Sequence, residues 1–162
     1  KTTGTLFNNI TFSQGQIVDL DKLLSSDTSL YEREWVIPKY DLIFLLQDTT
    51  IGIRNYYLQL RLDKYGQILS SNWPRKYYSN KSLFKSREQI LQFALQQAQA
   101  EGFDTSNYLI DFTHNYSQDK LCWLFKFKNN SNPKLDIYDV IEVDWISLTV
   151  VAKYRILTSK VN

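Results

Sequence analysis

The chain has 162 residues, a net charge of +2, one histidine and one cysteine. Its length fits one domain over residues 1–162. With 19 basic and 17 acidic residues the chain has no general attraction to nucleic acid, so we expect no nucleic-acid partner. No apolar run approaches the ~20 residues of a membrane helix, so we expect no membrane span. A single cysteine excludes an internal disulfide. The aromatic fraction of 15% favours β structure.

The first half of the chain indicates mainly strands. Residues 40–48, YDLIFLLQD, form an apolar run that is typical of a strand buried on both faces, and Pro38 before it favours a break or an edge position. In residues 55–62, NYYLQLRL, apolar side chains alternate with polar ones, as in a strand with one buried face. DKYG, residues 63–66, matches a type I turn and predicts a return strand through residues 68–69.

One helix is strongly indicated in the middle of the chain. Ser86 suits the N-cap, and Gln89 three residues later completes a capping box. Gly102 suits the position after the last turn. The sequence therefore predicts a helix over about residues 86–101, with these apolar residues on one face: Ile90, Leu91, Ala94, Leu95 and Ala98.

Strand patterns return after the helix. Residues 108–113 and 121–128 alternate between inward and outward positions, and a last β region runs over about 137–157 with a bend near Ile146. The expected fold is α+β, an antiparallel sheet packed against one main helix at about 86–101, either as one unit or as two related α+β halves.

A short internal similarity supports the second version. Residues 60–69, LRLDKYGQIL, and residues 141–150, IEVDWISLTV, both read apolar, charged, apolar, Asp, and then a turn and a strand. Two such units would suit a duplicated module, with repeats over residues 19–72 and 86–157.

Three segments within residues 86–151 resemble PepSY-like domains: SREQILQFALQQAQAEGF, KLCWLFKF and VIEVDWISLTVV. The shared pattern is a helix that begins near Ser or Thr with an Ala-rich face, a strand with an aromatic residue, and a strand that ends in Val-Asp before a hairpin. The family usually has Gly in that hairpin, where this chain has Ser147. The resemblance implies an antiparallel sheet on a helix, a cell-envelope or secreted setting, and a non-catalytic role in restraining peptidases.

Few residues suggest chemistry. Asp139, Glu142 and Asp144 could supply oxygen ligands, but on a strand Asp139 faces away from the other two. We interpret Glu142 and Asp144 as the solvent-facing side of a strand, with Asp144 at its turn. His114 and Cys122 are the sole pair for a nucleophilic dyad, and Cys122, in an apolar run, is expected to be a buried hydrophobe. We predict no catalytic residue, no metal site and no cofactor.

A loop before the helix holds the predicted contact surface. Trp73, Arg75, Tyr77 and Tyr78 cluster in SNWPRKYYSNKS, and recognition residues often lie on loops. The alternative is that they pack over the start of the helix. The cations of residues 75–87 also lie among aromatics, as in binders of single-stranded nucleic acid, but a solvated linker is the preferred interpretation.

These observations predict a non-enzymatic cell-envelope or secreted binding domain, inhibitory on the PepSY resemblance, whose protein partner is a peptidase. Two alternatives stay open: an immunity protein that neutralises a secreted bacterial toxin, and a small carboxylate-dependent hydrolase. The chain begins with Lys1 rather than Met, so we expect a trimmed or mature chain and a periplasmic or secreted location, with the cytoplasm as the alternative. The sequence gives no indication of oligomeric state.

Overall fold

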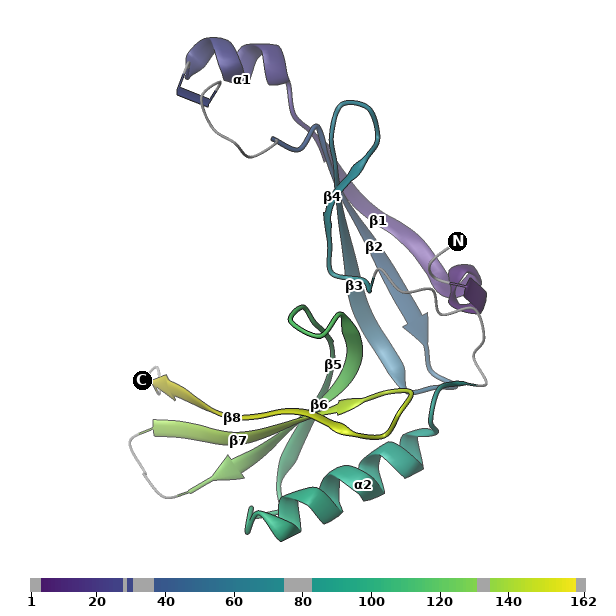
Figure 1. Ribbon diagram of the computed structural model, residues 1–162, viewed down its shortest axis with the longest axis vertical. Coiled ribbons are helices and arrows are strands. Elements are labelled where there is room, and N and C mark those ends of the chain that lie inside the picture. The colour runs from purple at the N-terminus through teal and green to yellow at the C-terminus, as the bar shows by residue number, and fades with distance from the viewer. Residues whose placement is uncertain (1–3, 28, 31–36, 75–82, 131–134, 160–162) are drawn as a thin grey trace.

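A computed structural model describes residues 4–27, 29–30, 37–74, 83–130 and 135–159. The described residues form two four-stranded antiparallel sheets, sheet A in the order β1-β2-β3-β4 and sheet B in the order β5-β6-β7-β8 (Figure 1). The predicted single sheet against one main helix is therefore wrong. The described fold is mostly β, with two α-helices. Alternating residues identify strands, but they do not say which strands share a sheet.

Sheet A is built from the first half of the chain. Its central strand β2 begins two residues after Pro38, which confirms the predicted break, although most of its side chains are half-buried rather than buried on both faces. β3 shows the predicted alternation, since Tyr56 and Leu58 are buried while Tyr57 is exposed. The strands are β1 (Ile10–Ile17), β2 (Tyr40–Asp48), β3 (Ile53–Leu62) and β4 (Ile68–Ser71).

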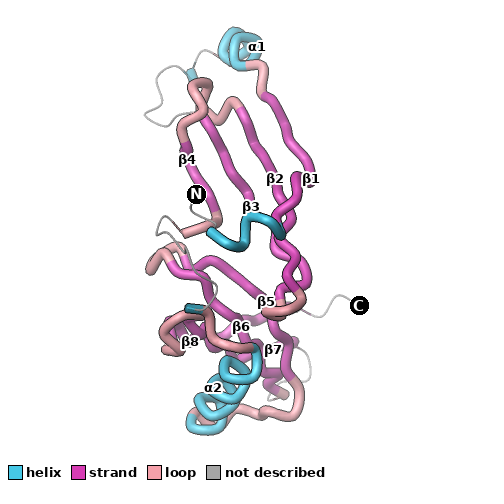
Figure 2. Tube along the Cα trace, turned by 90° about the vertical axis from the view of Figure 1, so that its right-hand side faces the viewer, coloured by secondary structure: helices cyan, strands magenta, loops and turns pink. Residues whose placement is uncertain are grey.

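In the described part of the chain, two α-helices and a 3-10 helix accompany the sheets. α1 (Leu20–Ser26) lies at the far end of sheet A, and α2 (Arg87–Ala100) lies beside sheet B (Figure 2). Both hydrogen bonds of the predicted capping box at Ser86 are present. The 3-10 helix η1 (Gly4–Asn9) precedes β1. None of the helices in the described part of the chain is long and apolar enough to cross a membrane.

Sheet B carries the helix on one face. Its strands are β5 (Tyr108–Asn115), β6 (Lys120–Asn129), β7 (Leu135–Asp144) and β8 (Val150–Ser159). The register places Ile110 opposite Phe125 and Phe125 opposite Ile141, so these three side chains share a face. They lie in one apolar cluster with the residues that α2 buries, namely Ile90, Ala94 and Ala98.

One hydrophobic core joins the two sheets. It includes Leu46, Ile53 and Tyr56 from sheet A, Trp123 from sheet B, and Trp145 from the turn that follows β7. The ring of Tyr56 meets that of Phe112 edge-on, with centroids 5.1 Å apart. Figure 1 shows β7 and β8 running across the long axis that sheet A follows. Sheet A therefore extends beyond the region where sheet B packs against it.

The two similar sequence segments occupy equivalent positions. Each turn joins the third and fourth strands of its sheet, and in each the carboxylate of the Asp, Asp63 or Asp144, accepts two backbone N–H groups of the turn. The left-handed residue is Gly66 in the first turn, with φ +82°, and Leu148 in the second, with φ +54°. The alignment of the two segments places Gly66 opposite Ser147, so the second turn is one residue longer than the first. Duplication of the module stays a prediction.

Candidate functional site

The predicted contact loop is described only at its start. Trp73 is 4% exposed and its ring lies 6.2 Å from that of Tyr56, so its side chain belongs to the core. Arg75, Tyr77 and Tyr78 lie outside the described residues. A contact surface at these three positions stays a prediction.

The three acids of β7 separate onto two faces, as the alternation predicts. Asp139 pairs with Phe127, on the face that α2 covers, whereas Glu142 and Asp144 pair with Leu124 and Cys122 on the other face. The predicted solvent-facing position of Glu142 and Asp144 is wrong, because they are 7% and 6% exposed.

Side chains from β5 and β8 enclose the carboxylate of Glu142 on β7. Asn115 Nδ2 on β5 donates to its Oε2 at 2.7 Å, and the Tyr154 hydroxyl on β8 donates to its Oε1 at 2.9 Å. Burial, and then the hydrogen bond to Glu142, raise the pKa of Tyr154 to about 12. Gln118, in the β5–β6 turn, donates from its Nε2 to Val151 O at 3.2 Å, so this turn contacts β8, the strand that carries Tyr154. Each carboxylate oxygen of Glu142 thus accepts a hydrogen bond from another strand of sheet B.

Asp144 holds the β7–β8 turn. Its Oδ1 accepts the backbone N–H groups of Ile146 and Ser147, and its Oδ2 lies 2.8 Å from Lys120 Nζ. Burial alone would raise the pKa of Asp144, but the hydrogen bonds from Lys120 and the turn outweigh it and hold the pKa below its usual value. Asp144 is therefore an ionised structural residue at neutral pH.

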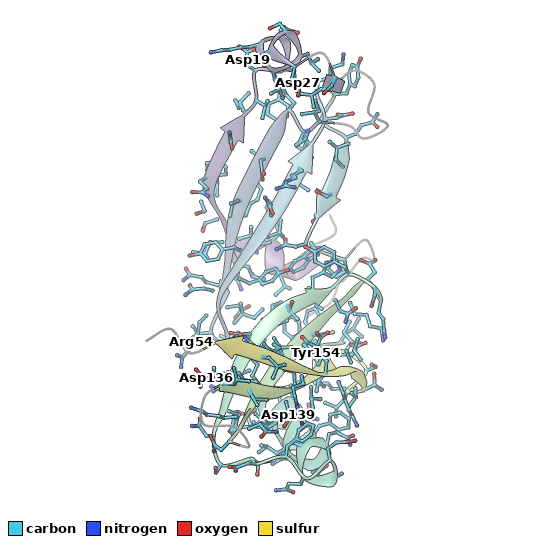
Figure 3. All side chains as sticks on the ribbon, turned by 90° about the vertical axis from the view of Figure 1, so that its left-hand side faces the viewer. Asp19, Asp27, Arg54, Asp136, Asp139 and Tyr154 are labelled. Atoms are coloured by element: carbon cyan, nitrogen blue, oxygen red, sulfur yellow. The ribbon has the colours of Figure 1, made fainter. Side chains whose placement is uncertain are left out.

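Asp139 is engaged separately. It accepts Arg155 Nε at 2.7 Å and Asn129 Nδ2 at 2.6 Å, and Figure 3 shows it on sheet B. Among the described residues, no group of three or more His, Cys, Asp or Glu could hold a metal ion.

His114 and Cys122 do not face each other. His114 pairs with Leu121 and Cys122 pairs with Thr113, so the two side chains lie on opposite faces of sheet B. Cys122 is buried as predicted, and burial, followed by the charges of nearby acids, raises the pKa of its thiol to about 12. The thiol is therefore protonated and enclosed, and the residues of the hypothetical dyad are not brought together.

A partly exposed apolar face on sheet A is the feature that sequence reasoning missed. Phe12, Ile17 and Ile68 are 62%, 69% and 65% exposed, and the register pairs them with Phe44, Tyr40 and Leu62. All belong to the face that continues into the core through Leu58 and Leu46. We name this surface the open face; its residues are Phe12, Ile17, Tyr40, Leu42, Phe44, Leu60, Leu62 and Ile68.

One pattern in the sequence indicates the open face. Leu58, Leu60 and Leu62 repeat at a period of two along β3, which indicates an apolar face longer than the part that sheet B covers. The edge contribution from β1 has no such signal, because a bulge between Phe12 and Gln14 shifts the register midway along the strand.

Comparisons of the chain with protein-family models, with curated proteins and with solved structures found no match.

Proposed function

We propose that this chain is a non-enzymatic binding domain that docks a protein partner on the open face of sheet A. The observation that carries the proposal is the exposure of Phe12, Ile17 and Ile68 on a face that is continuous with the core. Contiguous exposed apolar residues on a folded protein are typical of an interaction surface.

The second sheet of the same chain indicates what such a face accepts. On sheet B the equivalent role is filled by α2, which buries Ile90, Ala94 and Ala98 against the strands. Within the described residues no α-helix lies in that way on the open face, and α1 sits at the end of sheet A (Figure 2). We therefore propose an amphipathic helix of the partner as the occupant.

The state of the reactive residues supports a non-enzymatic role. Glu142, Asp144 and Asp139 each have hydrogen-bonding partners that fix them in the fold, and Cys122 is enclosed. A catalytic acid or nucleophile needs access to a substrate, which these positions do not offer.

The PepSY resemblance gives the partner its class. We propose a peptidase that is restrained by binding, in the cell envelope or outside the cell. The resemblance rests on residues 86–151, whereas the open face belongs to the first half of the chain, so the class of the partner and the position of its contact are separate parts of the proposal.

Binding and inhibition assays against cell-envelope and secreted peptidases test the proposal. The double variant Phe12→Ser/Ile17→Ser removes two exposed apolar side chains, each of which would contribute about 1.5–3 kcal/mol when buried in a complex. Isothermal titration calorimetry should show at least an approximately tenfold rise in Kd, and inhibition should weaken in parallel.

Tyr57→Ser is the matched control. Tyr57 is 58% exposed on the opposite face of sheet A, so its replacement should leave Kd unchanged. Equal binding by the double variant and the wild type would contradict the proposed surface. A second copy of this chain is the alternative occupant of the open face, and analytical ultracentrifugation of the free chain tests it. Self-association that the double variant abolishes would assign the open face to a second copy.

A further inference from the structure

A pocket of about 380 Å³ lies where the two sheets and α2 meet. We name it the junction pocket; it is lined by Gly52, Ile53, Arg54, Asn55, Arg87, Ile90, Leu91, Ile110, Asp111, Phe112, Trp123 and Phe125. Figure 3 shows Arg54 at the level where the sheets join. The volume is in the range that holds a small organic ligand. The pocket is separate from the open face, so its assignment does not depend on the proposed function.

The turn that forms one side of the pocket is fixed by hydrogen bonds. The carboxylate of Asp48 accepts the backbone N–H of Thr50 at 3.2 Å and the side-chain amide of Asn9. Gly52 follows with φ +90°, and a Cβ there would lie 3.4 Å from both Arg87 Cδ and Trp123 Cη2. A side chain would therefore fit beside Arg87 and Trp123, and the positive φ is what favours glycine at this position of the turn.

The inner wall of the pocket is apolar. Ile53, Ile90, Trp123 and Phe125 are all buried members of the core. Arg54, Asn55 and Arg87 are exposed and form its polar rim. A ligand that fills this pocket therefore places an apolar body inward and a polar group among the rim residues.

The charges on the rim are not balanced. Asp111 is the sole acid in the lining, and its carboxylate lies 2.5 Å from Lys126 Nζ. Neither Arg54 nor Arg87 forms an ion pair with any described residue. Two arginine residues thus line the same pocket, and neither is paired with a carboxylate of the described residues, an arrangement that favours an anion.

A buried donor in the wall lacks an acceptor. Trp123 is 6% exposed, and its indole N–H is one of two buried side-chain nitrogens without a hydrogen-bond partner in the described part of the chain. A buried donor without a partner is costly, and such groups are usually satisfied by water or by a ligand. Because Trp123 lines the junction pocket, an acceptor atom bound there is the partner that we infer for this N–H.

We propose that the junction pocket binds a carboxylate attached to an apolar body. The planar guanidinium of arginine matches a carboxylate through two parallel hydrogen bonds, and the aromatic and aliphatic wall accepts the rest of the ligand. Two sources share this chemistry: a free aromatic or aliphatic acid, and the C-terminal residue of another polypeptide.

Titration with N-acetyl-phenylalanine, and with its neutral amide as the isosteric control, tests the assignment. Calorimetry gives Kd, and ¹H–¹⁵N spectra follow the indole N–H signal of Trp123, which is identified by its loss in Trp123→Phe. The acid should bind and shift this signal, and the amide should bind at least about tenfold more weakly. A pentapeptide ending in phenylalanine forms the second arm: tighter binding than that of the free acid identifies a chain terminus, and equal or weaker binding identifies a small acid.

Charge variants locate the site. Arg54→Gln and Arg87→Gln should each raise Kd for the acid at least about tenfold, and the lysine variants, which keep the charge but lose the fork, should have intermediate effects. Arg61→Gln is the matched control, because Arg61 lies on the same strand as Arg54 but is paired with Asp41 at 3.0 Å. Equal binding of acid and amide, unchanged binding in both glutamine variants, or no binding of the acid by wild-type protein would overturn the assignment.

Discussion

Replacing Trp145 with alanine should remove much of the contact between sheet B and the segment that leads into α2. The side chain is fully buried, and its ring stacks on that of Phe84 with centroids 3.9 Å apart and meets Phe112 edge-on at 5.0 Å. Its indole N–H also donates to Lys85 O at 3.2 Å. Sixty residues separate Lys85 from Trp145, so the substitution weakens a long-range connection.

The magnitude follows from the buried area. A tryptophan buries about 150–250 Å², which at about 25 cal/mol per Å² gives an upper estimate of about 4–6 kcal/mol. Measured substitutions of buried Phe or Trp by Ala cost about 3–5 kcal/mol, and we expect the free energy of unfolding to fall by that amount. Trp145→Phe keeps a ring but loses the hydrogen bond to Lys85, so we expect a smaller loss of about 1–2 kcal/mol.

Urea unfolding followed by far-UV circular dichroism measures both variants, since this signal does not depend on the fluorescence of the replaced residue. Tyr65→Ala is the control, because Tyr65 is 76% exposed in a turn and should change stability by less than about 0.5 kcal/mol. A loss below about 1 kcal/mol for Trp145→Ala would refute the described packing.

Three further predictions concern titrating groups. Cys122 should not react with a thiol reagent at pH 8 until the protein unfolds, because its thiol is buried and its pKa is raised to about 12; rapid reaction under native conditions would contradict this. The pKa of Asp144 is lowered in the folded state, so its contribution is complete above the unfolded pKa of about 3.9 and is lost as the pH falls through the folded value. The difference in urea midpoint between wild type and Asp144→Asn should therefore be largest near neutral pH and shrink below about pH 4; a constant difference would argue against the ionised state. Tyr154 has a pKa raised to about 12, so its contribution is present below about pH 10 and is lost as the pH rises toward 12. Absorbance titration at high pH should show one late-titrating tyrosine fewer in Tyr154→Phe, and identical curves would count against its hydrogen bond to the acid.

Local signals predicted the local structure well. The helix predicted over 86–101 forms at Arg87–Ala100, and its start is fixed by the two hydrogen bonds of the capping box between Ser86 and Gln89. Tyr56 and Leu58 are buried where the alternation along β3 places them. Each of these features depends on residues close together in the chain.

The features that depend on distant residues were not predicted. Whether eight strands form one sheet or two depends on pairings that alternation does not encode. The burial of Glu142 depends on Asn115 and Tyr154, which lie 27 and 12 residues away on other strands. The junction pocket likewise combines Arg54 with Arg87, which belong to different elements and share no motif.

The order of the strands has a consequence for folding kinetics. In both described sheets every strand pairs with its neighbour in the sequence, so each sheet is a meander without crossovers. Pairings of this kind close comparatively short loops, and β proteins with low contact order fold faster than those whose strands pair across the chain. The long β1–β2 connection, which contains α1, and the docking of one meander on the other remain as the costly steps. We therefore expect the barrier to refolding to lie at those steps rather than in the assembly of sheet B.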